Sequence, residues 1–100
     1  MQRGGCIYFM TNRNKTTLYL GVTSNLIRRV QQHQQNYFPK SFTARYNLHV
    51  LVYYELFSHI AEAIAREKEV KKWSRHKKDL LITSANPGWH DLWEAEVRFW

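Results

Sequence analysis

The chain has 100 residues, of which 44% are hydrophobic and 15% aromatic, so it can fold as one domain and is not a disordered tail. Its one cysteine, Cys6, excludes an internal disulfide, and no apolar run reaches the roughly 18 residues of a membrane span. Both features favour a cytoplasmic protein without a membrane segment. The net charge of +7 favours a polyanionic partner, most simply nucleic acid, although ribosome association or plain solubility would give the same balance.

Two short runs of β-forming residues open the chain. They are Cys6–Met10 and Leu18–Val22, and the polar loop TNRNKTT between them favours a hairpin. If Ile7 and Phe9 lie on the same face as the apolar residues of the second run, alternation turns the other residues to the opposite face. That second face would carry Tyr8, Tyr19 and Gly21. The two tyrosines by themselves could simply be good strand residues.

A helix is expected after the hairpin. Residues 23–25 (TSN) are good N-cap residues, and LIRRVQQHQQ after them has an apolar side, with an end near Asn36. Arg29 and His33 are four residues apart, so they are neighbours on one face of this helix. The next stretch, KSFTARYN, is interpreted as a basic, aromatic loop with room for one helical turn.

The second half of the chain contains one strand and three predicted helices. Leu48–Leu56 is the longest β-rich run, and its apolar residues on both faces predict a central or well-covered strand. A long helix is predicted from Ile60 to His76, with Ser58 as its cap. A short helix is predicted over Asp79–Ser84, ended by Asn-Pro-Gly, and a closing helix over Trp89–Trp100.

One acidic residue of the long helix lies among apolar neighbours. The apolar stripe consists of Ile60, Ala63, Ile64 and Val70. At ~100° per residue, Glu67 lies near the middle of this stripe. A carboxylate turned inward is costly unless a cation, a metal or hydrogen-bond donors meet it. From the residues alone, an ion pair with Arg29 and a bound metal are equally good explanations.

The end of the long helix and the residues after it are strongly basic. Seven of the fifteen Lys and Arg residues lie between Arg66 and Lys78 without an equal number of acids, which favours phosphate contact over a merely solvated face. The residues expected to contact nucleic acid are Lys71, Lys72, Arg75, Lys77 and Lys78. Exposed aromatic residues such as Phe38 or Tyr46 could add base stacking.

The order of these motifs resembles the GIY-YIG endonuclease domain. CIY and YLG resemble its two name-giving motifs, and GVTSNLIRRVQQH resembles its signature first helix. AIAREKEVKKW and SANPGWHDL resemble later segments of its small stand-alone bacterial members. The resemblance implies an α+β fold with a small three-stranded, mainly antiparallel sheet flanked by helices. We therefore expect one such domain over residues 1–100, with a core at about residues 6–93.

The same resemblance implies a catalytic set and a metal. The implied catalytic residues are Tyr8, Tyr19, Arg29, His33, Glu67 and Asn86. Tyr8 would be the general base, Tyr19 would help to position water and phosphate, and Glu67 would hold one divalent ion, Mg²⁺ or Mn²⁺. The implied activity is metal-dependent hydrolysis of DNA phosphodiester bonds, with DNA repair or recombination as the family-level role. The sequence does not distinguish an enzyme that cuts only DNA from one that also cuts RNA.

Two residues depart from the family pattern, and two other functions compete with the nuclease. Cys6 stands where the first motif has glycine, and Leu20 replaces the usual Ile or Val, although neither position supplies a catalytic group. The main alternative is a basic nucleic-acid-binding module with a degenerate or unused nuclease site. A third is a protein-interaction domain that docks an acidic partner. The joint presence of the two tyrosines, Arg29 and Glu67 favours the nuclease, because neither alternative needs all four.

Overall fold

The computed structural model describes residues 4–100, so residues 1–3 of the expected domain lie outside the described part. The first half contains β1 (Gly5–Thr11), β2 (Leu18–Thr23), α1 (Leu26–Gln34) and α2 (Phe42–Arg45). The second half contains β3 (Val50–Phe57), α3 (Ile60–Lys71), α4 (Arg75–Ala85), α5 (Leu92–Ala95) and a 3₁₀ turn (Val97–Phe99). Within the described residues, no helix combines the length and apolarity needed to cross a membrane.

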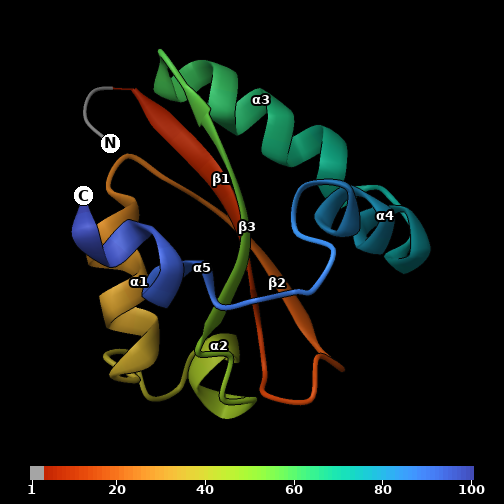
Figure 1. Ribbon diagram of the computed structural model, residues 1–100. Coiled ribbons are helices and arrows are strands. Elements are labelled where there is room, and N and C mark those ends of the chain that lie inside the picture. Colours follow the sequence, from red (N-terminus) through yellow and green to blue (C-terminus); the bar gives the residue numbers. More distant parts are fainter. Residues whose placement is uncertain (1–3) are drawn as a thin grey trace.

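The three strands form one antiparallel sheet in the order β2-β1-β3 (Figure 1). This sheet with its flanking helices confirms the predicted α+β fold. Of the two positions predicted for β3, central or well-covered, the second is the one observed. β3 is an edge strand, but its Leu51, Val52 and Tyr53 are buried. Helices on both sides of a small sheet explain why an edge strand is apolar on both faces.

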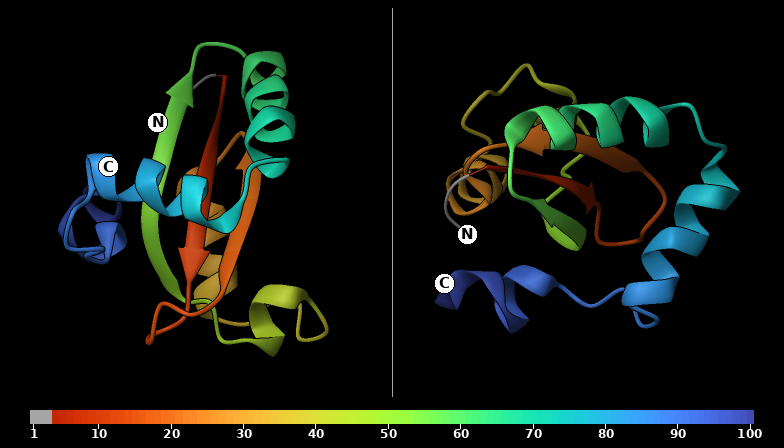
Figure 2. Two further views of the ribbon diagram at one scale, coloured as in Figure 1. Left: turned by 90° about the vertical axis from the view of Figure 1, so that its right-hand side faces the viewer. Right: turned by 90° about the horizontal axis from the view of Figure 1, so that it is seen from above.

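Strand alternation divides the apolar residues into two cores, one on each face of the sheet. Ile7 and Phe9 pack with the apolar residues of β2 and with α3 and α4, as the alternation predicted. Tyr8 and Tyr19 lie on the other face, against α1 and the C-terminal segment. Figure 2 shows this arrangement, with α3 and α4 in front of the sheet and α1 behind it in the left-hand view.

The long helix predicted over residues 60–76 is in fact two helices. α3 ends at Lys71, and α4 begins at Arg75 and absorbs the short helix predicted over residues 79–84. Ser74 causes the break, because its backbone is extended and its side chain accepts a hydrogen bond from the Lys77 backbone nitrogen at 3.1 Å. An N-cap therefore lies inside the basic run that the sequence reading treated as continuous helix.

Two other helix ends differ from the prediction. The N-cap of α3 is His59, not Ser58, and the Glu62 carboxylate accepts a hydrogen bond from the His59 backbone nitrogen at 3.1 Å. The closing segment is not one helix, because the backbone turns out of helical geometry at Glu96, between α5 and the 3₁₀ turn. Val97 is nevertheless buried, so this segment covers the face that holds Tyr8.

Candidate active site

Tyr8, Tyr19 and His33 meet on the face of the sheet that α1 covers. Tyr8 comes from the central strand, Tyr19 from β2 and His33 from the last turn of α1. Their ring centres lie 6.2 Å apart for the two tyrosines, 5.7 Å for Tyr8 and His33, and 5.6 Å for Tyr19 and His33. The Tyr8 hydroxyl lies 2.8 Å from His33 Nε2, and His33 Nδ1 lies 2.9 Å from Thr43 Oγ1. Three of the residues expected in the site are therefore in mutual contact.

Burial keeps the Tyr8–His33 pair uncharged at neutral pH. Tyr8 is completely buried, and this desolvation raises the pKa of its phenol well above the usual value, while Arg29 opposes the shift only in part. Burial also lowers the pKa of His33 to about 4, and the positive charge of Arg29 acts in the same direction. The contact at rest is thus a hydrogen bond between a neutral phenol and a neutral imidazole.

Arg29 lies one turn before His33 on α1 and is half-buried. Its Nη1 donates to Gln32 Oε1 at 3.2 Å, and its Cζ lies 6.0 Å from the centre of the Phe38 ring. No carboxylate of residues 4–100 forms an ion pair with it, so the Arg29–Glu67 pair that the sequence left open does not form. The guanidinium therefore retains donors for an anionic ligand.

Glu67 lies on the other side of β2 from the tyrosine pair, on α3. It is half-buried and shares a helix face with the buried Ala63 and Val70, which agrees with the inward direction expected from the stripe. A cleft of about 340 Å³ crosses the β2 edge here. Its lining consists of Leu18, Tyr19, Leu20, Phe42, Glu67, Lys71 and Lys78. Tyr19 therefore connects the aromatic cluster with the cleft that contains Glu67.

The carboxylate of Glu67 fits, in its chemistry, the divalent metal that the resemblance implies. It has no hydrogen bond or ion pair with any residue from 4 to 100, although it is half-buried. No cluster of three or more His, Cys, Asp or Glu exists in this part of the chain, and among the residues that line the cleft Glu67 is the one carboxylate. Mg²⁺ is often held by one or two carboxylates together with substrate phosphates and waters, and such a site needs no larger cluster.

Asn86 does not join the tyrosine cluster. It ends α4 and is buried, and its Nδ2 donates to the carbonyl oxygens of Val52 and His90, both at 3.0 Å. Its Oδ1 accepts from the His90 backbone nitrogen at 3.1 Å. Val52 belongs to β3, at the sheet edge opposite to β2. The side chain thus holds the 86–90 loop to the sheet, in contrast to the active-site position implied by the resemblance.

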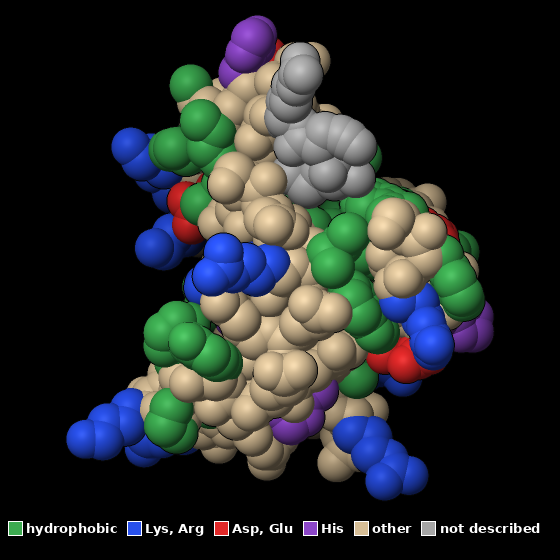
Figure 3. Space-filling model, turned by 90° about the vertical axis from the view of Figure 1, so that its left-hand side faces the viewer, with side chains coloured by type: hydrophobic (Ala, Val, Ile, Leu, Met, Phe, Trp, Pro, Cys, Tyr) green, Lys and Arg blue, Asp and Glu red, His purple; other side chains and the backbone are tan. Residues whose placement is uncertain are grey.

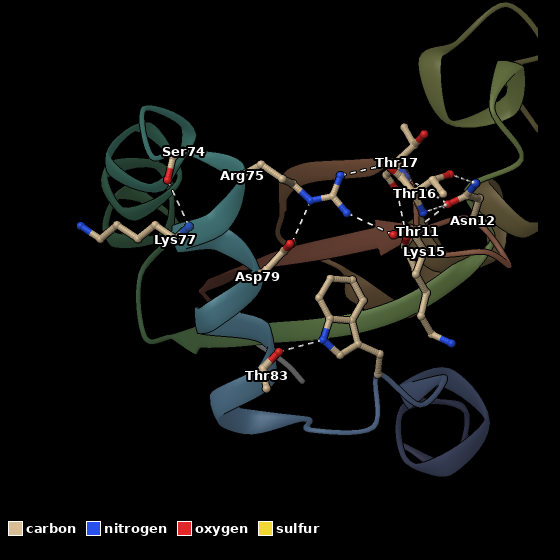
Figure 4. Close-up of polar contacts among 11 residues, drawn as sticks. Thr11, Asn12, Lys15, Thr16, Thr17, Ser74, Arg75, Lys77, Asp79 and Thr83 are labelled. Carbon is tan, nitrogen blue, oxygen red and sulfur yellow. Dashed lines mark hydrogen bonds and ion pairs between the residues drawn. The ribbon is translucent and has the colours of Figure 1, made fainter.

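Arg75 is engaged with the protein itself. Its Nε donates to Asp79 at 2.8 Å, its Nη1 to the Thr16 carbonyl at 2.9 Å and its Nη2 to the Lys15 carbonyl at 3.1 Å. Figure 4 shows the guanidinium reaching from α4 to the loop between β1 and β2. Although the sequence reading grouped Arg75 with the phosphate-binding residues, these contacts fasten a helix to the hairpin.

The other basic residues of the predicted set have separate positions. Lys71 and Lys78 line the cleft beside Glu67, whereas Lys77 Nζ lies 4.1 Å from the centre of the Trp73 ring. Lys72 follows α3 and is exposed. Figure 3 shows the side of the molecule on which α1 lies, and there the Lys and Arg side chains stand apart from one another instead of forming one patch. Of the five, Lys71 and Lys78 are the ones placed at the candidate site.

Two residues of the site were missed in the sequence. Thr43 contacts His33, and Phe42 lines the cleft with its ring centre 6.4 Å from that of Tyr19. Both lie in α2, which the sequence indicated only as room for a helical turn. Ser41, whose side chain accepts from the Ala44 backbone nitrogen, is the N-cap signal that marks this helix.

Comparison with known proteins shows the family to which the chain belongs. The profile of the GIY-YIG catalytic domain matches residues 4–79. A UPF0213 protein of Staphylococcus haemolyticus is 40% identical over 66 residues, which cover 66% of this chain and 79% of the relative. A UPF0213 protein of Bacillus pumilus is 32% identical over 82 residues, covering 82% and 83% of the two chains.

A solved structure has the same fold. The solution NMR structure of a UPF0213 protein from Bacillus halodurans superposes with a TM-score of 0.55 at 26% sequence identity. The alignment covers 87% of this chain and 90% of that one. The match therefore extends over most of both chains.

Proposed function

Because the chain belongs to the GIY-YIG family, we propose that it is a divalent-metal-dependent endonuclease that hydrolyses DNA phosphodiester bonds. The observation that carries this proposal is the carboxylate of Glu67, which has no ion pair within residues 4–100 and shares its cleft with Tyr19. A purely structural glutamate at a half-buried position would be expected to have a cationic or hydrogen-bonding partner.

Three side chains would bind and orient the scissile phosphate. Lys71 and Lys78 line the cleft and would attract the phosphate, while Arg29, with its planar fork of donors, would stabilise the charge that develops on its oxygens. Glu67 would hold the Mg²⁺ or Mn²⁺ ion, and a divalent ion bound there supplies Lewis-acid activation of the phosphate. The half-buried Tyr19 would position the phosphate and the attacking water.

Tyr8 and His33 would handle the proton of the attacking water. A tyrosine acts as a base only as the phenolate, and burial disfavours this form in the resting protein. His33 Nε2, 2.8 Å from the hydroxyl, can receive the phenol proton, and Arg29 favours the phenolate that remains. The phenolate oxygen then accepts the water proton. We propose the cytoplasm, and DNA repair or recombination, as the setting of this activity, from the single reduced Cys6 and the family resemblance.

The test is cleavage of duplex, single-stranded and branched DNA with Mg²⁺, Mn²⁺ or a chelator. Glu67→Gln should reduce cleavage on the order of 100-fold or more, because Gln cannot supply the negative charge. Glu69→Gln is the matched control, since Glu69 is exposed on the same helix and pairs with Arg66 instead. Full-rate cleavage by Glu67→Gln would refute the metal-ligand assignment. Metal-independent binding without any cleavage would support the binding-module alternative.

A further inference from the structure

We propose that Thr43 is a positioning residue of the active site, whose hydroxyl holds His33 in the tautomer protonated at Nδ1, so that Nε2 faces Tyr8 as an acceptor. This inference deepens the proposed function and rests on it for its catalytic part, whereas the tautomer itself is a property of the resting protein. It concerns a residue outside the motifs that led to the site. The geometry consists of two contacts, 2.8 Å from Tyr8 to Nε2 and 2.9 Å from Nδ1 to Thr43.

The first step concerns the proton of the phenol. A neutral imidazole carries one proton, either on Nδ1 or on Nε2, and its neighbours determine which form is stable. The Tyr8 hydroxyl is completely buried, and within residues 4–100 its only hydrogen-bond acceptor is His33 Nε2. If Nε2 carried the proton, the buried phenol proton would have no acceptor, which is a costly arrangement. The contact with Tyr8 therefore favours a His33 ring that accepts at Nε2 and is protonated at Nδ1, and this form needs an acceptor for its Nδ1 proton.

The second step concerns the acceptor for the Nδ1 proton. Thr43 Oγ1 is that acceptor, and Thr43 is only 3% exposed. Its hydroxyl lies 3.2 Å from Ser41 Oγ, which also caps α2 by accepting from the Ala44 backbone nitrogen. The Thr43 hydroxyl can thus donate to Ser41 while it accepts from His33. The four groups then form a chain in which every donor points the same way, from Tyr8 through His33 and Thr43 to Ser41.

This arrangement suits proton transfer better than it suits stability alone. When the Tyr8 proton moves to Nε2, the ring becomes an imidazolium with a donor at each nitrogen. Nδ1–H donates to Thr43 both before and after the transfer, so the threonine contact need not rearrange during the step. In the opposite tautomer, Nε2 already carries a proton and cannot receive another. Thr43 acts through His33 and has no need to touch the substrate.

The test uses NMR to find which His33 nitrogen carries the proton at pH 7, together with cleavage kinetics. Long-range ¹H–¹⁵N spectra should show His33 protonated at Nδ1 in the unmodified protein and in Thr43→Ser, which keeps the hydroxyl. Thr43→Val, which removes the hydroxyl at nearly constant volume, should lose this pattern. Its kcat should fall by roughly 10–100-fold with KM little changed, and Thr43→Ser should restore most of kcat.

Thr83→Val is the matched control, because Thr83 also accepts a hydrogen bond in its native contact, from Trp89 Nε1, and lies outside the candidate site. It should leave the His33 spectrum and kcat unchanged. A ring protonated at Nε2 in the unmodified protein would overturn the inference, as would a Thr43→Ser protein as slow as Thr43→Val. The spectrum of the unmodified protein needs neither cleavage nor a folded Val variant, so it separates failure of this inference from failure of the nuclease proposal.

Discussion

The ring of Tyr8 occupies the space in which a side chain at Gly21 would begin. The two residues are paired across β1 and β2, and a Cβ on Gly21 would lie 2.4 Å from both Cζ and the hydroxyl oxygen of Tyr8. No real Cβ approaches other atoms so closely, and Tyr8 is completely buried, so it has little room to move aside. The glycine of the YLG motif is thus required by the tyrosine of the other motif.

Gly21→Ala should therefore displace Tyr8 and break its contact with His33. We expect loss of most cleavage activity and a lower melting temperature, because overpacking a core typically costs about 1–3 kcal/mol. Circular dichroism melting and a cleavage assay measure the two effects. Gly88→Ala is the control, since the nearest atoms to its added Cβ belong to the side chain of His90, which is exposed and can move aside. Equal effects of the two substitutions would contradict this account of Gly21.

The sequence predicted those parts of the fold and site that depend on local periodicity. The hairpin faces follow from the two-residue period of a strand, so the common face of Tyr8 and Tyr19 was correctly derived. The four-residue spacing of Arg29 and His33 likewise follows from one turn of helix. The cleft beside β2 was not foreseen, because it depends on how α2, α3 and β2 pack together.

The features that sequence reasoning missed depend on one helix-capping residue or on contacts between residues far apart in the chain. Ser74 is one polar residue within a basic run, and nothing in the periodicity marks it as an N-cap. Arg75 contacts carbonyl groups 59 and 60 residues earlier in the chain, and the sequence does not show contacts over such distances. Its positive charge was the only visible feature, and that charge indicated phosphate binding. Thr43 reaches His33 only because the loop after α1 returns to the helix end. The apolar stripe singled out Glu67 and the resemblance implied its metal role, but within residues 4–100 Arg29 is not its partner.

His33 should make the protein less stable in mild acid. Its pKa is about 4 in the folded protein against an ordinary value of 6.5, so between these values the unfolded chain binds a proton that the folded chain does not. Stability should therefore be fully present above about pH 6.5 and fall as the pH decreases to about 4, by up to about 3 kcal/mol. Urea unfolding at a series of pH values measures this loss.

His33→Gln is the control for the acid effect, because glutamine does not titrate. Its overall stability is expected to be lower, but the part of the pH dependence that belongs to His33 should disappear. An unchanged slope in His33→Gln would show that other groups cause the acid sensitivity.

The basic residues should separate into a structural and a DNA-binding class. Arg75→Gln removes two contacts to the β1–β2 loop and the ion pair with Asp79, so we expect a lower melting temperature. Lys78→Gln, at the cleft, should leave melting nearly unchanged but weaken DNA binding and reduce the slope of log affinity against log salt by about one. Fluorescence anisotropy over a salt series and thermal melting measure the two properties. If Arg75→Gln changed only the salt slope, the fastening role would be wrong.

Asn86 provides the sharpest contrast between the family resemblance and the geometry. Asn86→Ala leaves the carbonyls of Val52 and His90 and the His90 amide without their partner, so unfolding should become easier by about 1–3 kcal/mol. At a temperature where the variant is still folded, kcat per folded molecule should remain close to that of the unmodified protein, because the amide is buried against β3. An active-site asparagine would show the reverse, with lost kcat and nearly unchanged melting. Parallel urea unfolding and single-turnover cleavage distinguish the two roles.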